Sequence, residues 1–133
     1  MANRLYDKGR EKFLRGEISW NADNIKAVLV DTATYTADFV NDEFLSTIPA
    51  GERVATSVNL TAKTTTAGVA DAGDVTFSAV TGDPSEVLVV YKDTGSAATS
   101  PLIAYIDTAS GLFVTPNGGD IQTNWNGSGI FKL

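Results

Sequence analysis

The residues best suited to chemistry are aspartates that follow apolar runs of the chain. Asp93-Thr94-Gly95 comes directly after residues 86–92, which we predict to form a strand. Two carboxylates on such turns, brought together from two copies of the chain, can share one proton and serve as general acid and base in hydrolysis. The chain contains no histidine and no cysteine. It therefore lacks the commonest general base and most of the side chains that bind zinc and other transition metals.

Asp-Thr-Gly is also the sequence of the catalytic turn of aspartic proteases. A homodimer of this chain could in principle bring two copies of the Asp93 turn together. Lys92 precedes the aspartate where those enzymes have an apolar residue, and no apolar-apolar-glycine segment follows downstream. An aspartate also accepts a hydrogen bond from the backbone two residues on, which ends a strand and starts a turn. Asp-Thr-small-Ser/Thr occurs three times, at residues 31–34, 93–96 and 107–110. We therefore expect turn chemistry and no enzyme, with the Asp93 protease as a different-class alternative.

Calcium is the cation that the acidic residues could bind. Asp71 and Asp74 flank Gly73, and the aspartates of the three repeated turns would converge if their strands were neighbours. Calcium needs several oxygen ligands, and the spacing matches no EF-hand loop. We expect solvated turn aspartates, with no metal and no cofactor.

Charge is divided unevenly along the chain. Residues 1–16 contain five Lys and Arg against two Asp and Glu, a net charge of +3, whereas the remaining residues have a net charge of −9. A basic arm on an acidic body favours assembly over catalysis, and the acidic body argues against nucleic-acid binding. We expect the arm to bind an acidic neighbour. The predicted partner-binding residues are Arg4, Tyr6, Lys8, Arg10, Lys12, Arg15 and Trp20.

The spacing of apolar and turn residues predicts a mainly β chain. Residues 3–14 have helical character with Gly16 as a stop, and residues 39–48 predict one further short helix ended by Pro49. Short strands are expected at residues 25–30, 53–61, 69–80, 86–92, 101–106, 111–114, 120–125 and 129–133. This rhythm is typical of an antiparallel β-sandwich or small barrel. We expect a basic helical arm over residues 1–16 and one β-rich domain over residues 17–133, with Trp125 in the core.

Apolar runs in the chain are strand-sized. None approaches the roughly 18–20 residues that span a bilayer, and no apolar segment follows the charged N-terminus. We therefore expect no membrane span and no secretory signal.

Six segments, which together cover nearly the whole chain, resemble a family of small virion structural proteins of tailed bacteriophages. They are MANRLYDKGREKFL, IKAVLVDTATYT, DEFLSTIPAGERVATSVNLT, DVTFSAVTGDPSE, VVYKDTGS and PLIAYIDTASGLFVTPNGGDIQTNWNGSGIFKL. The resemblance implies a role in particle structure, and no catalytic residue is carried over from it.

Within that family, the composition favours a capsid decoration (cement) protein. The resemblance implies a protein made in the bacterial host cytoplasm and bound to the capsid exterior, where it stabilises the head by bridging major capsid subunits. Its expected partners are the major capsid protein and copies of itself, in a homo-oligomer for which a trimer is one candidate. No small-molecule substrate is expected. A head–tail connector or tail component of the same virion is the alternative.

Overall fold

Antiparallel pairing organises the chain around one five-stranded sheet. The computed structural model describes residues 3–133, and the sheet runs in the order β1-β7-β6-β2-β3. Two two-stranded ribbons, β4-β9 and β5-β8, complete the β structure. The elements are β1 (Arg4–Leu5), α1 (Asp7–Leu14), β2 (Ile25–Val30), η1 (Leu45–Thr47), η2 (Ala50–Glu52), β3 (Arg53–Thr56), η3 (Thr66–Gly68), β4 (Val69–Ala70), β5 (Val75–Phe77), β6 (Val87–Lys92), β7 (Leu102–Ile106), β8 (Ile121–Thr123) and β9 (Phe131–Lys132). The prediction of a mainly β chain with antiparallel sheets is confirmed.

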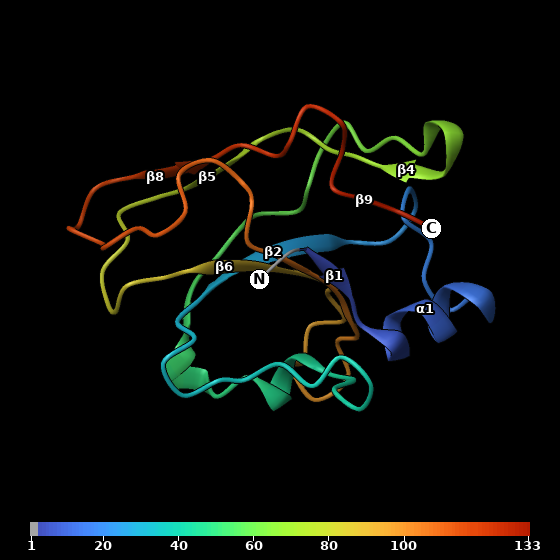
Figure 1. The fold of residues 1–133 in the computed structure, drawn as a ribbon, viewed down its shortest axis with the longest axis horizontal. Coiled ribbons are helices and arrows are strands. Elements are labelled where there is room, and N and C mark those ends of the chain that lie inside the picture. The colour runs from blue at the N-terminus through green and yellow to red at the C-terminus, as the bar shows by residue number, and fades with distance from the viewer. Residues whose placement is uncertain (1–2) are drawn as a thin grey trace.

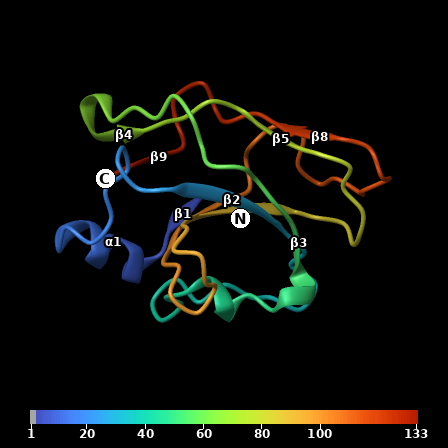
Figure 2. The same ribbon diagram turned by 180° about the vertical axis from the view of Figure 1, so that it is seen from behind.

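Both faces of the central sheet are covered, which explains why β2, β6 and β7 are mostly apolar on both faces, with Lys26 and Lys92 as the exceptions, rather than alternating. The two ribbons lie over one face, and the segment that contains η1 and η2 lies over the other (Figures 1 and 2). Successive β2 side chains point to opposite faces of the sheet. Leu29 packs in the core between the sheet and the ribbons, whereas Val28 and Val30 pack in the core on the opposite face.

The sheet is open. β1 and β3 form its two edges, and within residues 3–133 these strands pair with β7 and β2 respectively, not with each other. The prediction of a small barrel was therefore wrong for the described part of the chain. Closure would need the two edge strands to meet, but β1 is only two residues long.

The basic N-terminal segment is built into this sheet and does not hang from it. Arg4 and Leu5 pair with Tyr105 and Ala104 of β7, and the Asp7 N–H donates to the Phe39 carbonyl at 2.8 Å. α1 follows at once and ends where Gly16 adopts a φ of +74°, as its sequence predicts. Residues 3–16 thus pair with and pack against β7, and the division into an arm and a body stays a prediction. Residues 1 and 2 lie outside the described residues.

The short helix expected at residues 39–48 is reduced to the three-residue 3-10 turn η1. The backbone N–H groups that would form the hydrogen bonds of such a helix donate instead to side chains and to carbonyls distant in the sequence. The Asp38 carboxylate accepts from the N–H groups of Val40 and Asn41, and the Leu45 N–H donates to Ser100. Helical spacing of apolar residues was therefore overridden by turn chemistry.

Several predicted strands are shorter than their patterns indicated, and others are divided or absent. Pairing of β3 ends at Thr56, and the Asp-Ala-Gly-Asp interruption at residues 71–74 separates β4 from β5. Residues 111–114 form no strand, only an isolated bridge from Val114 to Ser85. Gly111 and Phe113 both have positive φ, which breaks an extended ladder.

A buried chain of hydroxyl groups ties the 31–52 segment to the sheet. The hydroxyls of Tyr6 and Tyr35 lie 2.8 Å apart, and Tyr35 donates to Asp42 at 2.9 Å. Burial raises the pKa of both tyrosines well above the usual value. The neutral form is therefore the one that the fold favours.

Replacement of Tyr35 by phenylalanine is expected to lower the free energy of unfolding by about 1–3 kcal/mol, because it leaves Tyr6 without its buried partner. In the wild type, stability should hold below the unfolded tyrosine pKa of about 10 and fall as the pH rises above it. Urea unfolding at about pH 8 and about pH 11 checks both points. The variant should lose less stability than the wild type between these pH values, and an equal loss would contradict the assignment.

Candidate functional site

α1 lies unusually close to the sheet because of one glycine. Gly9 is buried, and a Cβ placed on it would lie 2.5 Å from the Leu102 carbonyl oxygen and 3.1 Å from the Ile103 Cα. In the sequence this glycine only weakens a predicted helix; in the fold it allows the helix backbone to contact β7. This contact fixes which face of α1 points outward.

A row of aromatic rings joins α1 to the C-terminal strand. The ring of Phe131 on β9 lies 6.1 Å from that of Phe13 and 5.3 Å, edge-on, from that of Trp20. The Trp20 indole N–H donates to the Asp71 carbonyl at 3.2 Å. With 5% of its surface exposed, Trp20 belongs to the core and offers little surface to a partner; its role in partner binding stays a prediction. Trp125 is buried as predicted.

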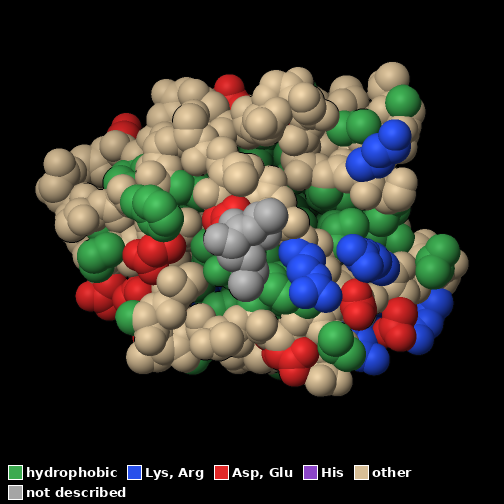
Figure 3. All heavy atoms as spheres, in the orientation of Figure 1, with side chains coloured by type: hydrophobic (Ala, Val, Ile, Leu, Met, Phe, Trp, Pro, Cys, Tyr) green, Lys and Arg blue, Asp and Glu red, His purple; other side chains and the backbone are tan. Residues whose placement is uncertain are grey.

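Between α1 and β9 the surface is hollowed. We name this hollow the α1–β9 groove; it has a volume of about 470 Å³ and is lined by Leu5, Arg10, Phe13, Leu14, Lys132 and Leu133. A second hollow of about 260 Å³ continues from it past Arg4 and shares three of these residues. Leu14 is 89% exposed and Leu133 62% exposed, although both are aliphatic. Figure 3 shows Lys and Arg side chains gathered at this end of the molecule, with hydrophobic side chains exposed between them.

The predicted basic residues differ in how far they are free to bind. Lys12 is the least free, because it lies 3.5 Å from both Glu17 and Glu43 and over the Phe44 ring. Lys8 and Arg10 form exposed i,i+3 ion pairs within α1, a type of contact that contributes little. Arg4 covers the Phe39 ring, and Arg15 is exposed.

Tyr6 is fully buried and leaves no side-chain surface for a partner, so its predicted contact also stays a prediction. Arg10 is the one groove residue among the predicted partner-binding residues, and five were missed from the sequence: Leu5, Phe13, Leu14, Lys132 and Leu133. The sequence does contain one signal for Lys132: it is the only Lys or Arg after Lys92, so it is an isolated cation in an otherwise uncharged or acidic stretch. Its position beside Arg10 depends on long-range packing that the sequence does not display.

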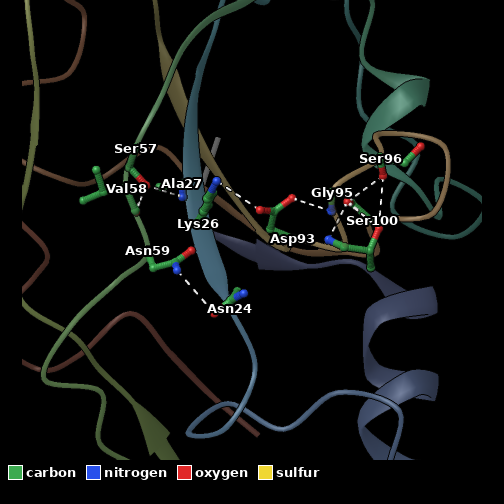
Figure 4. Close-up of polar contacts among 11 residues, drawn as sticks. Asn24, Lys26, Ala27, Ser57, Val58, Asn59, Asp93, Gly95, Ser96 and Ser100 are labelled. Atoms are coloured by element: carbon green, nitrogen blue, oxygen red, sulfur yellow. Dashed lines mark hydrogen bonds and ion pairs between the residues drawn. The ribbon is translucent and has the colours of Figure 1, made fainter.

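Asp93 forms the turn that its sequence predicts. Its carboxylate accepts from the Gly95 N–H at 3.0 Å and pairs with Lys26 Nζ at 3.0 Å (Figure 4). The Gly95 hydrogen bond and the Lys26 ammonium hold the pKa of this carboxyl below its usual range. A proton-sharing pair needs one carboxyl with a raised pKa. This geometry favours the turn over the protease interpretation.

The other aspartates of the repeated turns behave in different ways. Asp31 accepts from the Ala33 N–H at 2.9 Å, which repeats the Asp93 arrangement, whereas the Asp107 N–H donates to the Asn3 side chain. Among residues 3–133, no three His, Cys, Asp or Glu side chains are grouped so that they could hold a metal ion. No described helix has the length and apolar character needed to cross a bilayer.

No protein-family model and no curated protein matches this chain.

Proposed function

We propose that this chain is a structural protein of a tailed-phage virion, and that it acts as a capsid decoration protein bridging major capsid subunits. The observation that supports an assembly role is the α1–β9 groove, which combines exposed apolar side chains with cations on a chain of net charge −6. Specific interfaces commonly join an apolar centre to a polar rim. The phage assignment itself rests on the sequence resemblance described above.

Charge defines the kind of neighbour that this surface suits. Arg10 and Lys132 line the groove, and Arg4 lines its continuation. Within residues 3–133, Arg4 and Lys132 form no ion pair with an acidic side chain. An acidic neighbour that carries an apolar side chain would bury the exposed leucines and offset these charges. Subunits of a capsid and other copies of this chain are the proposed neighbours.

We also propose that the central sheet and the two ribbons act as the layers of an antiparallel β-sandwich. Leu29 and Leu88 of the sheet share one core with Val75 and Phe77 of the β5-β8 ribbon. Two layers packed over a shared core in this way are the defining feature of a β-sandwich.

Co-sedimentation tests the proposed function. Particles of the encoding phage that lack this chain would be mixed with purified protein and pelleted. We expect saturable binding on the order of hundreds of copies per particle, as a symmetric shell offers. Saturation at tens of copies or fewer would favour the connector or tail alternative. Failure to bind at any concentration would contradict a virion role.

A further inference from the structure

Phe113, in the loop between β7 and β8, is a large apolar side chain that is exposed outside the α1–β9 groove. It is 81% exposed, and its backbone φ is +51°, in the left-handed region that bulky residues avoid. Nothing within the described chain packs over the ring to explain this conformation. Residues held in such sparsely populated backbone conformations cluster at functional sites.

The backbone that follows Phe113 is hydrogen-bonded to a neighbouring loop. The Ser85 N–H donates to the Val114 carbonyl at 2.9 Å, and the Val114 N–H donates back at 3.1 Å. Gly118 donates to the Val80 carbonyl at 2.8 Å, so the loop at residues 107–120 lies against the loop at residues 78–86. The exposed ring of Phe113 is therefore carried by a hydrogen-bonded loop. This loop leads into β8, and the β5-β8 end of the molecule lies away from α1 (Figure 1).

This end is acidic. Asp83 and Asp120 are exposed in these two loops, and neither forms an ion pair within residues 3–133. The two loops contain no Lys or Arg, and residues 64–131 contain only Lys92. Figure 3 shows Asp and Glu side chains beside exposed hydrophobic ones at this end, and Lys and Arg at the other. The two ends are therefore complementary in charge, and each has exposed apolar side chains.

We propose that Phe113 of one copy inserts into the α1–β9 groove of a second copy. Asp83 and Asp120 would then approach Arg10 and Lys132 of that second copy. Because the two surfaces differ, a pair of copies joined in this way still has one free groove, on the first copy, and one free Phe113, on the second. Association therefore continues until a ring closes or a filament grows. This inference deepens the proposed function, on which it rests, by naming the partner of the groove as the chain itself.

Mixing two variants tests the contact. Phe113→Ser removes the inserted ring and keeps the groove, whereas Leu14→Glu blocks the groove and keeps the ring. Both positions are exposed, so neither change should disturb the fold. Sedimentation velocity with light scattering should show oligomers for the wild type and a monomer for each variant alone. An equimolar mixture should form a one-to-one dimer and nothing larger.

Val58→Ser is the matched control, because Val58 is 79% exposed and lies outside both surfaces, and it should associate like the wild type. A wild type that is monomeric at about 1 mM would mean a dissociation constant weaker than about 1 mM and would overturn the proposal. If the Phe113→Ser variant associated as strongly as the wild type, the proposal would be overturned too, because the copies would then contact each other through another surface.

These results can be separated from those of the co-sedimentation assay. A monomeric wild type that still binds particles would refute the self-association and leave the proposed function standing. Oligomers that bind no particle would refute the proposed function and leave the contact between copies standing.

Discussion

Replacement of Gly9 by alanine is expected to destabilise the protein by about 1–3 kcal/mol, although alanine is the better helix former. The added methyl group would lie 2.5 Å from the Leu102 carbonyl oxygen, and backbone cannot rotate away as a side chain can. Helix propensity offers a gain of at most about 1 kcal/mol. Relief of the clash would push α1 off β7. Urea unfolding measures the difference.

Gly127→Ala is the control. A Cβ at Gly127 meets no atom within 4 Å, so this change should leave stability nearly unchanged or raise it slightly by restricting the unfolded chain. If Gly9→Ala were as stable as this control, the close approach of α1 to the sheet would be wrong. The outline of the α1–β9 groove would then be wrong with it.

Neutralising the groove is expected to weaken particle binding roughly tenfold, the equivalent of about 1.4 kcal/mol. The double variant Arg10→Gln/Lys132→Gln removes two exposed cations that line the groove. Exposed charges act mainly through steering and salt-sensitive attraction, so the loss should be largest at low ionic strength. The co-sedimentation assay, repeated over a salt series, measures it.

A second double variant separates the groove from net charge. Ala50→Glu/Ala98→Glu changes the charge by the same amount at two exposed positions outside the groove. It should bind within about twofold of the wild type, because screened charges act over about 10 Å. Equal weakening by both double variants would mean that overall charge, and not this surface, controls binding.

Local patterns predicted much of the β structure. The branched apolar run at residues 25–30 forms β2 with the predicted bounds, and Asp31 and Asp93 form the turns that their side chains favour. Gly16 ends α1 as expected. Each of these outcomes depends on neighbours in the chain, which is the information that a sequence displays directly.

Long-range packing decided the rest. Tyr6 looked like a surface residue of a basic helix, but β1 pairing places it in the core beside Tyr35. The groove depends on β9, where Lys132 and Leu133 come within reach of α1 from the far end of the chain. From the sequence, Gly9 only weakens a predicted helix, whereas in the fold it is where the backbone of α1 comes close to that of β7. None of these pairings has a signature in local spacing.

Cryo-electron microscopy of the native particle tests the central claim most directly. Our account predicts density for this chain on the outer face of the icosahedral shell, on the order of hundreds of copies, with the α1–β9 groove filled by a neighbour. Density confined to the neck or tail would contradict the decoration role. Absence of the chain from the particle would contradict a virion role altogether.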